Sequence, residues 1–487
     1  MREDGEDMRI LKNYLYNAVY QLFIIIVPFI TIPYIARTIG PYGVGVNTFT
    51  NSIIQYFILL GTLGLTMYGN RQIAYTRNDK VKMTKTFWEI EGLLCLTVTI
   101  SYLIFYVYLE LNNDFKAYYL AQSLTIIAVI FDVSWFFMGV ENFRVTVIRN
   151  AIIKIISISL IFLVVKNSGD LLKYILINSC AILLGNMTFW PYLRNYLVKI
   201  SFKELNIFTH LKPALILFIP QIATNIYVVL NKTMLGALSS INAAGFFDNS
   251  DKIIKIILAV LTSLATVMMP RVANTFASGD KEKVNKYLKI SFDFTMLMAV
   301  PLMFGLSAIA IRFAPWFLGN DFMVVGKVME LEAPVILVIA TASVVGNQYL
   351  LPTNHNKQYT LSVTLGAVIN LVLNVPLILY FGALGTAVAT VISELCVTLA
   401  QLFFIRKLVK LRILFLDFWK YILSGLVMYL CVKLLNIFLS FNILTLLVEV
   451  ASGIIIYVLM IFIMHPNILD FIDSFLNDNQ LKFWRKK

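Results

Sequence analysis

Apolar runs long enough to cross a bilayer recur along almost the whole of this chain. An α-helix rises about 1.5 Å per residue, so about 20 apolar residues span a hydrocarbon core of ~30 Å. Fourteen such runs follow one another, at residues 13–36, 44–68, 86–109, 117–139, 148–165, 172–192, 212–234, 243–268, 290–311, 328–350, 359–380, 383–405, 417–437 and 443–464. No segment between them is long enough for a soluble domain. The sequence therefore predicts an all-α, polytopic membrane protein of about fourteen transmembrane helices.

The basic residues alternate from one side of the predicted spans to the other. Of the 40 Lys and Arg residues, 26 fall in the N-terminal segment and alternate loops, 5 in the opposite loops and 9 within the bounds of the spans. Because basic residues accumulate in cytoplasmic loops, this split predicts a multi-pass protein of the bacterial cell membrane with both termini in the cytoplasm. The net charge of +13 is thus an orientation signal, and we expect no nucleic-acid partner.

The stretch from residue 220 to 274 carries charges inside two consecutive spans. Lys232 interrupts the first span, Arg271 follows the second, and four charges occupy one helical face near the start of the second. These four are Asp248, Asp251, Lys252 and Lys255, and their spacing predicts the pairs Asp248–Lys252 and Asp251–Lys255. Since charge is costly against lipid, the face is expected to line a water-filled path.

Three landmarks of this stretch occur in the same order near the N-terminus. RTIG (37–40), YGVG (42–45) and GNRQIA (69–74) match KTMLG (232–236), AGFF (244–247) and MPRVAN (269–274). The repeat has a period of six spans, so its copies run in the same sense. It predicts two pseudo-symmetric lobes, at 1–205 and 206–412, with the substrate path between them and an added helix pair and tail at 413–487.

The same landmarks resemble those of the polysaccharide repeat-unit (Wzx-type) flippases. The resemblance rests on PYIARTIGPYGVG (33–45), GLTMYGNRQIA (64–74), DVSWFFMGVENFRV (132–145), the charged stretch 220–274 and the segment 351–394. This family belongs to a superfamily that also holds multidrug and toxin extrusion (MATE) transporters and the lipid II flippase. The resemblance covers essentially the whole chain. It implies a MATE-like flippase that alternates between inward-open and outward-open forms and carries an undecaprenyl-pyrophosphate-linked oligosaccharide, as for capsule, O-antigen or teichoic acid.

A pyrophosphate anion crossing the membrane needs cations at several depths, which the chain supplies. The candidates are Lys232, Lys252, Lys255 and Arg37 on the outer side, and Lys154, Arg71 and Arg271 on the inner side. Lys232 and Lys154 have an alternative role in reaching the lipid headgroups, and the charges at 248–255 have an alternative role as ion pairs on a solvated helix end. Three polar residues of the seventh span either bind sugar hydroxyls or bond neighbouring helices: Gln221, Asn225 and Asn231.

Four acids at depth are candidates for ion coupling or charge pairing: Asp248, Asp251, Asp132 and Glu394. Asp132 either binds a proton or sodium ion or pairs with Arg144 or Lys154. Glu394 has no basic residue nearby in sequence, so it either carries a coupling cation or neutralises a lysine of another span. No other cofactor is expected, and neither the coupling ion nor the energy source is decided.

Two other functions compete with glycan flipping. An integral-membrane glycosyltransferase needs acids or a metal cluster in a large loop, whereas the loops here are short and the three histidines are far apart. We therefore expect a transporter and not an enzyme, with no metal site. A cation-coupled multidrug exporter needs an acidic, aromatic cavity, whereas cations at least match acids along the expected path. The expected partners are the lipid-linked glycan and membrane lipids, and we expect a monomer.

Overall fold

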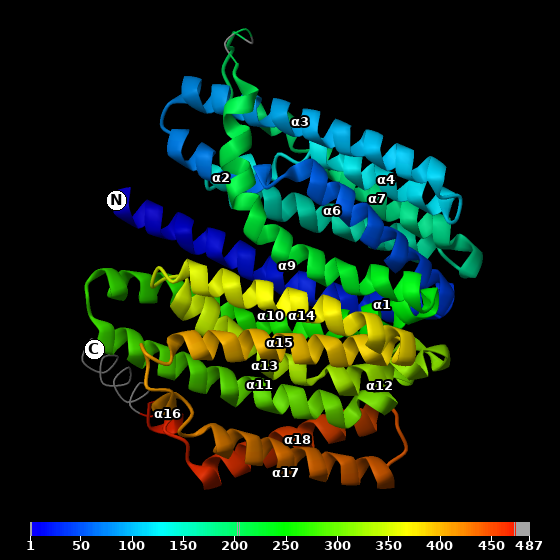
Figure 1. Cartoon of the computed structure of the whole chain (residues 1–487), viewed down its shortest axis with the longest axis vertical. Coiled ribbons are helices and arrows are strands. Elements are labelled where there is room, and N and C mark those ends of the chain that lie inside the picture. The colour runs from blue at the N-terminus through cyan, green and yellow to red at the C-terminus, as the bar shows by residue number, and fades with distance from the viewer. Residues whose placement is uncertain (1, 202, 204, 472, 474–487) are drawn as a thin grey trace. The chain divides into compact units, whose positions relative to one another are not determined.

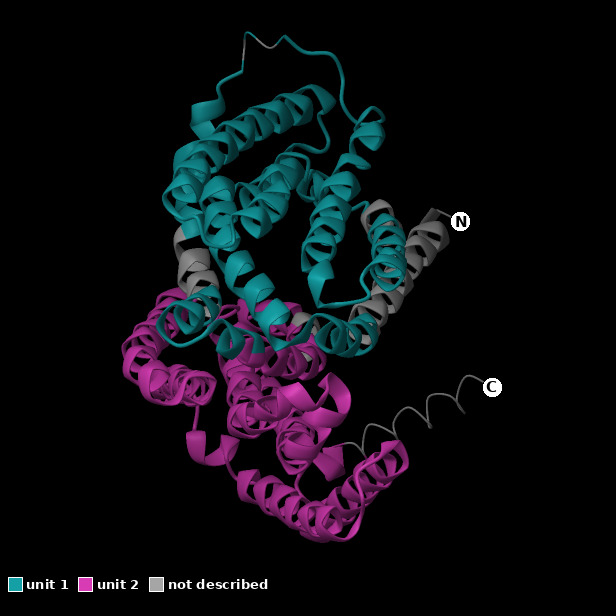
Figure 2. Ribbon diagram, turned by 90° about the vertical axis from the view of Figure 1, so that its right-hand side faces the viewer, with its two compact units in different colours: residues 1–245 teal, residues 246–487 magenta. Residues whose placement is uncertain are grey.

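The computed structural model describes residues 2–201, 203, 205–471 and 473. Their side chains are described except at 2–26, 143–148, 219–228, 264, 266 and 267. In this part of the chain the regular elements are helices, without β-strands. The chain divides into two compact units, Met1–Gly245 and Phe246–Lys487 (Figure 2). The three-part division at residues 205 and 412 remains a proposal about the parts that move during transport.

Unit 1 holds the helices of the first half of the chain (Figure 1). They are α1 (Arg2–Thr62), α2 (Leu65–Thr76), α3 (Lys80–Leu111), α4 (Lys116–Ile130), α5 (Ser134–Gly139), α6 (Phe143–Val164), η1 (Ser168–Asp170), α7 (Leu171–Met187), α8 (Trp190–Leu193), η3 (Ile207–His210), α9 (Leu211–Leu238) and the start of α10 (Ile241–Ala277). The long helix α1 is broken at Gly40, where φ is 71°, a conformation that a side chain disfavours. Helix therefore continues on both sides of a kink at this glycine.

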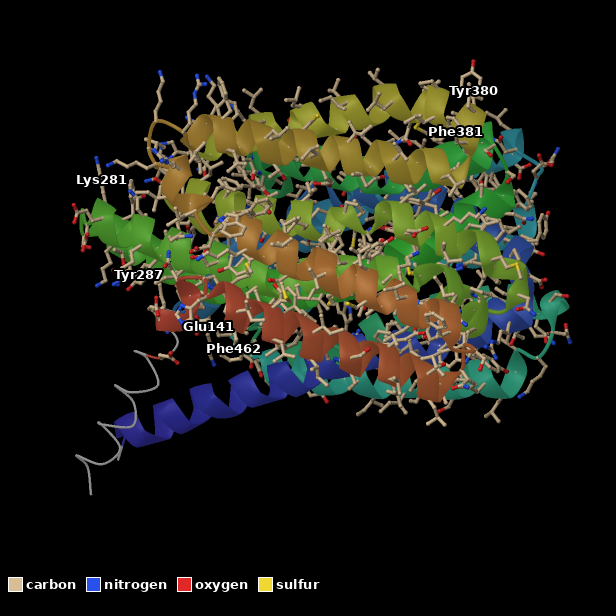
Figure 3. The ribbon with its side chains drawn as sticks, turned by 90° about the horizontal axis from the view of Figure 1, so that it is seen from below. Glu141, Lys281, Tyr287, Tyr380, Phe381 and Phe462 are labelled. Atoms are coloured by element: carbon tan, nitrogen blue, oxygen red, sulfur yellow. The ribbon has the colours of Figure 1, made fainter. Side chains whose placement is uncertain are left out.

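Unit 2 holds the rest of α10 and the helices that follow. They are α11 (Lys281–Leu318), η4 (Asn320–Phe322), α12 (Met323–Glu332), α13 (Pro334–Val345), η5 (Gly346–Leu350), α14 (Asn356–Phe381), α15 (Ala383–Ile405), α16 (Leu411–Leu414), α17 (Phe418–Phe438) and α18 (Ile443–Met464). Within this unit, Lys281 and Tyr287 of α11 lie at one end of the helices, and Tyr380 and Phe381 of α14 lie at the other (Figure 3).

Each of the fourteen predicted spans falls on helix, but the count of fourteen is not confirmed. Among the described residues, ten helical segments are long and apolar enough to cross a membrane, or eleven if the bent pair Asn320–Glu332 and Pro334–Leu350 forms one span. One of the ten, Val27–Thr76, contains the end of the first predicted span and all of the second, because helix continues on both sides of Gly40.

Aromatic side chains build much of the core of unit 1. The ring of Phe87 on α3 stacks on Trp135 of α5, with centroids 5.6 Å apart. Phe137 stacks on Phe189 beside α8 at 5.4 Å. All four rings are almost fully buried. Since such rings bury large apolar areas, they fix α5 and α8 against α3.

The start of α3 is capped by Asp79, in the short loop that follows α2. Its carboxylate accepts hydrogen bonds from the backbone N–H groups of Lys82 at 3.1 Å and Val81 at 3.0 Å. These bonds hold the pKa of Asp79 below its ordinary value, with Lys82 the main cause. Because a lowered pKa favours the ionised form, the cap stabilises α3 at neutral pH and weakens as the pH falls through the acid range.

The second half of α1 packs closely on the α9–α10 turn within unit 1. A Cβ at Gly45 would overlap the carbonyl oxygen of Ile241, and one at Gly245 would lie 2.8 Å from the nitrogen of Gly45. Only glycine fits at these two positions. Gly45 and Gly245 belong to two of the segments that the sequence matches as a repeat, and the repeat itself stays a prediction.

Candidate functional site

The predicted charged face of α10 forms two ion pairs one helical turn long. Lys252 Nζ lies 2.5 Å from Asp248 Oδ2, and Lys255 Nζ lies 2.7 Å from Asp251 Oδ2. Both pairs therefore form as the i, i+4 spacing predicts. The pairing neutralises the face as a whole, so its chemistry depends on which of the four charges are accessible.

The acids of this face are buried and the lysines are exposed. The side chains of Asp248 and Asp251 are 5% and 13% exposed, whereas those of Lys252 and Lys255 are 44% and 46% exposed. A molecule that reaches this face therefore meets ammonium groups, each held in place from behind by a carboxylate. Lysine ammonium groups bind phosphate as point charges.

The same part of α10 is fixed inside unit 2 by contacts with the region around α12. The hydroxyl of Ser250 donates a hydrogen bond of 2.6 Å to Glu332 Oε2. The ring of Phe246 packs edge-on against Phe322, with centroids 5.9 Å apart. Both Ser250 and Glu332 are almost fully buried. The sequence analysis did not identify Glu332, because its predicted place near the start of a span resembles an ordinary helix end.

Lys232 lies on α9 beside a set of hydrogen-bonded hydroxyls in unit 1. The next residue, Thr233, donates to Ser52 Oγ at 2.8 Å and shares a 3.1 Å hydrogen bond with the hydroxyl of Tyr56. Asn231 is buried and Lys232 is half-buried. Thr233 therefore faces the second half of α1, which the sequence alone could not show.

Arg37 is exposed on α1, three residues before the break at Gly40. One turn earlier, the hydroxyl of Tyr34 donates to the carbonyl oxygen of Val165 at 2.6 Å, and its ring packs on Phe162. The end of α6 thus holds this part of α1 in place, while the guanidinium of Arg37 remains accessible.

Arg71 lies at one end of a buried polar chain that the sequence analysis missed. Its guanidinium is 5.7 Å from the centroid of the Tyr68 ring. The Tyr68 hydroxyl is 2.9 Å from His210 Nδ1, and His210 Nε2 is 3.0 Å from Glu89 Oε2. Glu89 also accepts a hydrogen bond from the backbone N–H of Asn206. The chain ties the segment before α9 to α2 and α3, and the only sequence signal was a single His just before a predicted span.

The remaining candidates are dispersed over both units. Lys154 on α6 and Arg271 on α10 are exposed, and Glu394 on α15 is buried. Asp132 is half-buried between α4 and α5, where its carboxylate accepts a hydrogen bond from Ser134 N at 3.0 Å. The side chains of two candidates lie outside the described residues: Gln221 and Asn225. The structure thus brings together the four charges of α10, while the other candidates remain predictions about a path.

Repeated apolar helices with a broken α1 and ionised groups within α10 are typical of membrane transporters. The profile of the family described as "Polysaccharide biosynthesis protein" matches residues 10–276, more than half of the chain. The chain belongs to this family.

Relatives and solved structures agree with this assignment. A protein of Escherichia coli (strain K12) named "Putative O-antigen transporter" is 23% identical over 408 residues, covering 81% of this chain and 96% of that protein. The fold is similar to that of the lipid II flippase MurJ in an inward closed conformation, with a TM-score of 0.77 at 16% identity over 94% of this chain and 100% of that one. It is also similar to an inward-facing MATE transporter of the MOP superfamily, with a TM-score of 0.61 at 12% identity, over 80% of this chain and 98% of that one.

These findings confirm the family and the fold class that the sequence motifs indicate. The helical, MATE-like architecture is the expected one, and the named relative is a putative transporter, in agreement with the expectation of a transporter and not an enzyme.

Proposed function

We propose that the protein is a flippase that carries an undecaprenyl-pyrophosphate-linked oligosaccharide from the cytoplasmic to the outer leaflet of the cell membrane. The glycan is a repeat unit of capsule, O-antigen or teichoic acid, and transport proceeds by alternating access between two lobes, with both termini in the cytoplasm. The near full-length relationship to a putative O-antigen transporter supports the glycan-lipid class.

The charge arrangement on α10 is the observation that carries this proposal. A pyrophosphate is an anion, and the accessible groups of the face are the ammonium groups of Lys252 and Lys255. An exporter of lipophilic cations would need the carboxylates to be the accessible groups. Here the carboxylates are behind the lysines, where they hold each ammonium in position without occupying the path. Such a pair binds phosphate without trapping it, because the carboxylate competes for the same ammonium.

The test is complementation of a strain that lacks its own glycan flippase. Lys232→Ala, Lys252→Ala and Lys255→Ala are each compared with the wild type at matched membrane levels. Since a charge-assisted hydrogen bond contributes about 1.5–3 kcal/mol, each variant should reduce surface glycan about tenfold or more and accumulate lipid-linked precursor inside.

Lys173→Ala provides a matched control for these variants. Lys173 on α7 pairs at 2.6 Å with the buried Asp170, and its side chain is 58% exposed, so the variant removes a similar pair outside the proposed path. It should retain full activity. Full activity in all three path variants would contradict the assignment of α9 and α10. Export of a lipophilic cation by the wild type, without glycan flipping, would support the multidrug exporter instead.

A further inference from the structure

One acid in unit 1 is buried without a partner. Glu91 of α3 is 1% exposed, and neither of its carboxylate oxygens has a hydrogen-bond partner among the described residues. A buried carboxylate without donors is very costly if it is ionised. Such a group either carries a proton or binds a cation.

A second acid lies close to Glu91 at a break between two helices. The carboxylate of Asp132 is near enough to interact electrostatically with that of Glu91. Asp132 stands between the end of α4 at Ile130 and the start of α5 at Ser134. Broken helices within spans are the usual place for ion sites in transporters, because the freed groups face a cavity and not lipid.

Both acids approach from the same end of unit 1. Arg77, which follows α2, pairs at 2.6 Å with Glu141, which follows α5. Asp132 is three residues before Trp135, whose ring stacks on Phe87, and Phe87 is one turn before Glu91 on α3. The two acids therefore lie in the same region of unit 1.

An unused donor is also buried in this region. The indole N–H of Trp135 has no acceptor among the described residues. Its ring stacks on Phe87, which lies one turn before Glu91 on the same face of α3. An acid without donors and a donor without an acceptor thus both occur near Phe87 in the described part of unit 1, which favours an ionisable site over a packing defect.

The other charged and titratable groups on the helices packed around α3 are engaged elsewhere. Arg71 of α2 and His210 of η3 belong to the polar chain described above, which ends at Glu89. Because Glu89 is two residues from Glu91, it lies on another face of α3. On the remaining neighbours, Lys116 of α4 pairs with Glu110 at 3.0 Å near the opposite end of α3, and Arg37 lies at the far end of α1 near Gly40. Cys95, one turn after Glu91, is half-buried and close enough to interact with it.

Three backbone carbonyls just before Asp132 already accept hydrogen bonds. Asn186 Nδ2 donates to the carbonyl of Ala128 at 2.8 Å, and Trp190 Nε1 donates to the carbonyl of Phe131 at 3.2 Å. Val129 accepts from the backbone N–H of Asp132. The carbonyls that the helix break frees are thus largely used, whereas a sodium ion needs several free oxygens. A proton needs only the two carboxyls.

We propose that Glu91 and Asp132 form a proton-binding site in which one proton, held as an O–H on one carboxyl, is donated in a hydrogen bond to the other carboxylate. Protonation stabilises the form in which Glu91 is buried, and loss of the proton favours a form in which the α4–α5 break admits water. The link to transport, in which the proton gradient biases this change, rests on the proposed flippase function.

Infrared spectroscopy of the full-length protein in lipid nanodiscs tests the site without any transport. At neutral pH the wild type should show the C=O band of a protonated carboxylic acid that shifts in D₂O. Glu91→Gln should lose the band, and Asp132→Asn should shift it. Glu110→Gln, which changes an exposed acid of the same helix, should leave the band unchanged. Absence of the band in the wild type, its persistence in Glu91→Gln, or its loss on adding sodium ions would overturn the proton site.

A flipping assay in vesicles with an imposed pH gradient tests the coupling. Wild-type flipping should respond to the gradient, and Glu91→Gln should flip without that response while unfolding at a temperature equal to or above that of the wild type. Flipping in the wild type that ignores the gradient would overturn the coupling. If the wild type flips no glycan lipid but shows the band, the flippase function fails and the proton site stands.

Discussion

At the scale of single residues, glycine decides how closely these helices approach. Gly385 near the start of α15 lies against the carbonyl oxygen of Leu377 on α14, and any Cβ there would overlap it. Gly305 of α11, in contrast, has open space, and its nearest neighbour would be the Met428 methyl at 3.8 Å. The two glycines look alike in the sequence, and only the packing separates them.

Gly385→Ala should lower the stability of the protein by about 1–3 kcal/mol, because α14 and α15 must separate to admit the methyl group. Gly305→Ala should be neutral or slightly stabilising, since alanine favours a helix and meets no obstacle. Thermal unfolding in detergent measures both. Equal stability of the two variants would show that the α14–α15 contact is not as close as the structure has it.

At the scale of elements, buried ion pairs fasten the last two spans to α11. Arg312 of α11 binds the side chain of Asn436 at 3.1 Å and the carbonyl of Leu439 at 2.6 Å, and it lies 3.9 Å from Glu449 of α18. At the other end of α17, Lys289 of α11 lies 3.9 Å from the carboxylate of Asp417, which precedes α17. The helices α17 and α18 run side by side in unit 2 (Figure 1). Polar contacts therefore hold α17 at both of its ends.

Arg312→Ala should destabilise unit 2 by about 2 kcal/mol, less than the ~3–5 kcal/mol of a fully buried pair because the Arg312 side chain is 28% exposed. The loss arises because Glu449 remains buried without a counter-charge. Arg312→Met combined with Glu449→Leu should recover most of the stability.

Lys433→Ala breaks the more exposed pair with Glu330 and should cost less than about 1 kcal/mol. Thermal unfolding and proteolysis of the α17–α18 loop measure these effects, and a double variant no better than the single one would contradict the role of the pair.

At the scale of the whole molecule, the loop charges predict which helix ends face the cytoplasm. Lys281 begins α11 in a segment with five predicted cytoplasmic basic residues, and Tyr380 ends α14 at a loop without any. These two residues lie at opposite ends of unit 2 (Figure 3). The arrangement agrees with the alternation of basic loops, and the absolute orientation remains a proposal.

Cysteine labelling in intact cells tests the orientation. The four native cysteines are all free and only partly exposed, so they can be replaced to give a cysteine-free background. A membrane-impermeant maleimide should label Tyr380→Cys and should label Lys281→Cys only after the membrane is opened. The reverse pattern would place both termini outside and would reverse the proposed direction of transport.

The sequence by itself determined the properties that depend on local chemistry. Apolar length predicts the spans, and helical spacing predicts the pairs Asp248–Lys252 and Asp251–Lys255. The family follows from motifs that stand within the matched segment. Each of these depends on residues near one another in the chain.

Only the tertiary structure decided which polar groups meet across helices and which are accessible. The contacts of His210 with Tyr68 and Glu89 join segments more than a hundred residues apart, and no periodicity encodes them. The sequence likewise could not show that the acids of α10 are buried while its lysines are exposed, or that Glu91 lacks a donor. Burial and long-range hydrogen bonds depend on how helices pack, and packing is a property of the whole fold and not of a single segment.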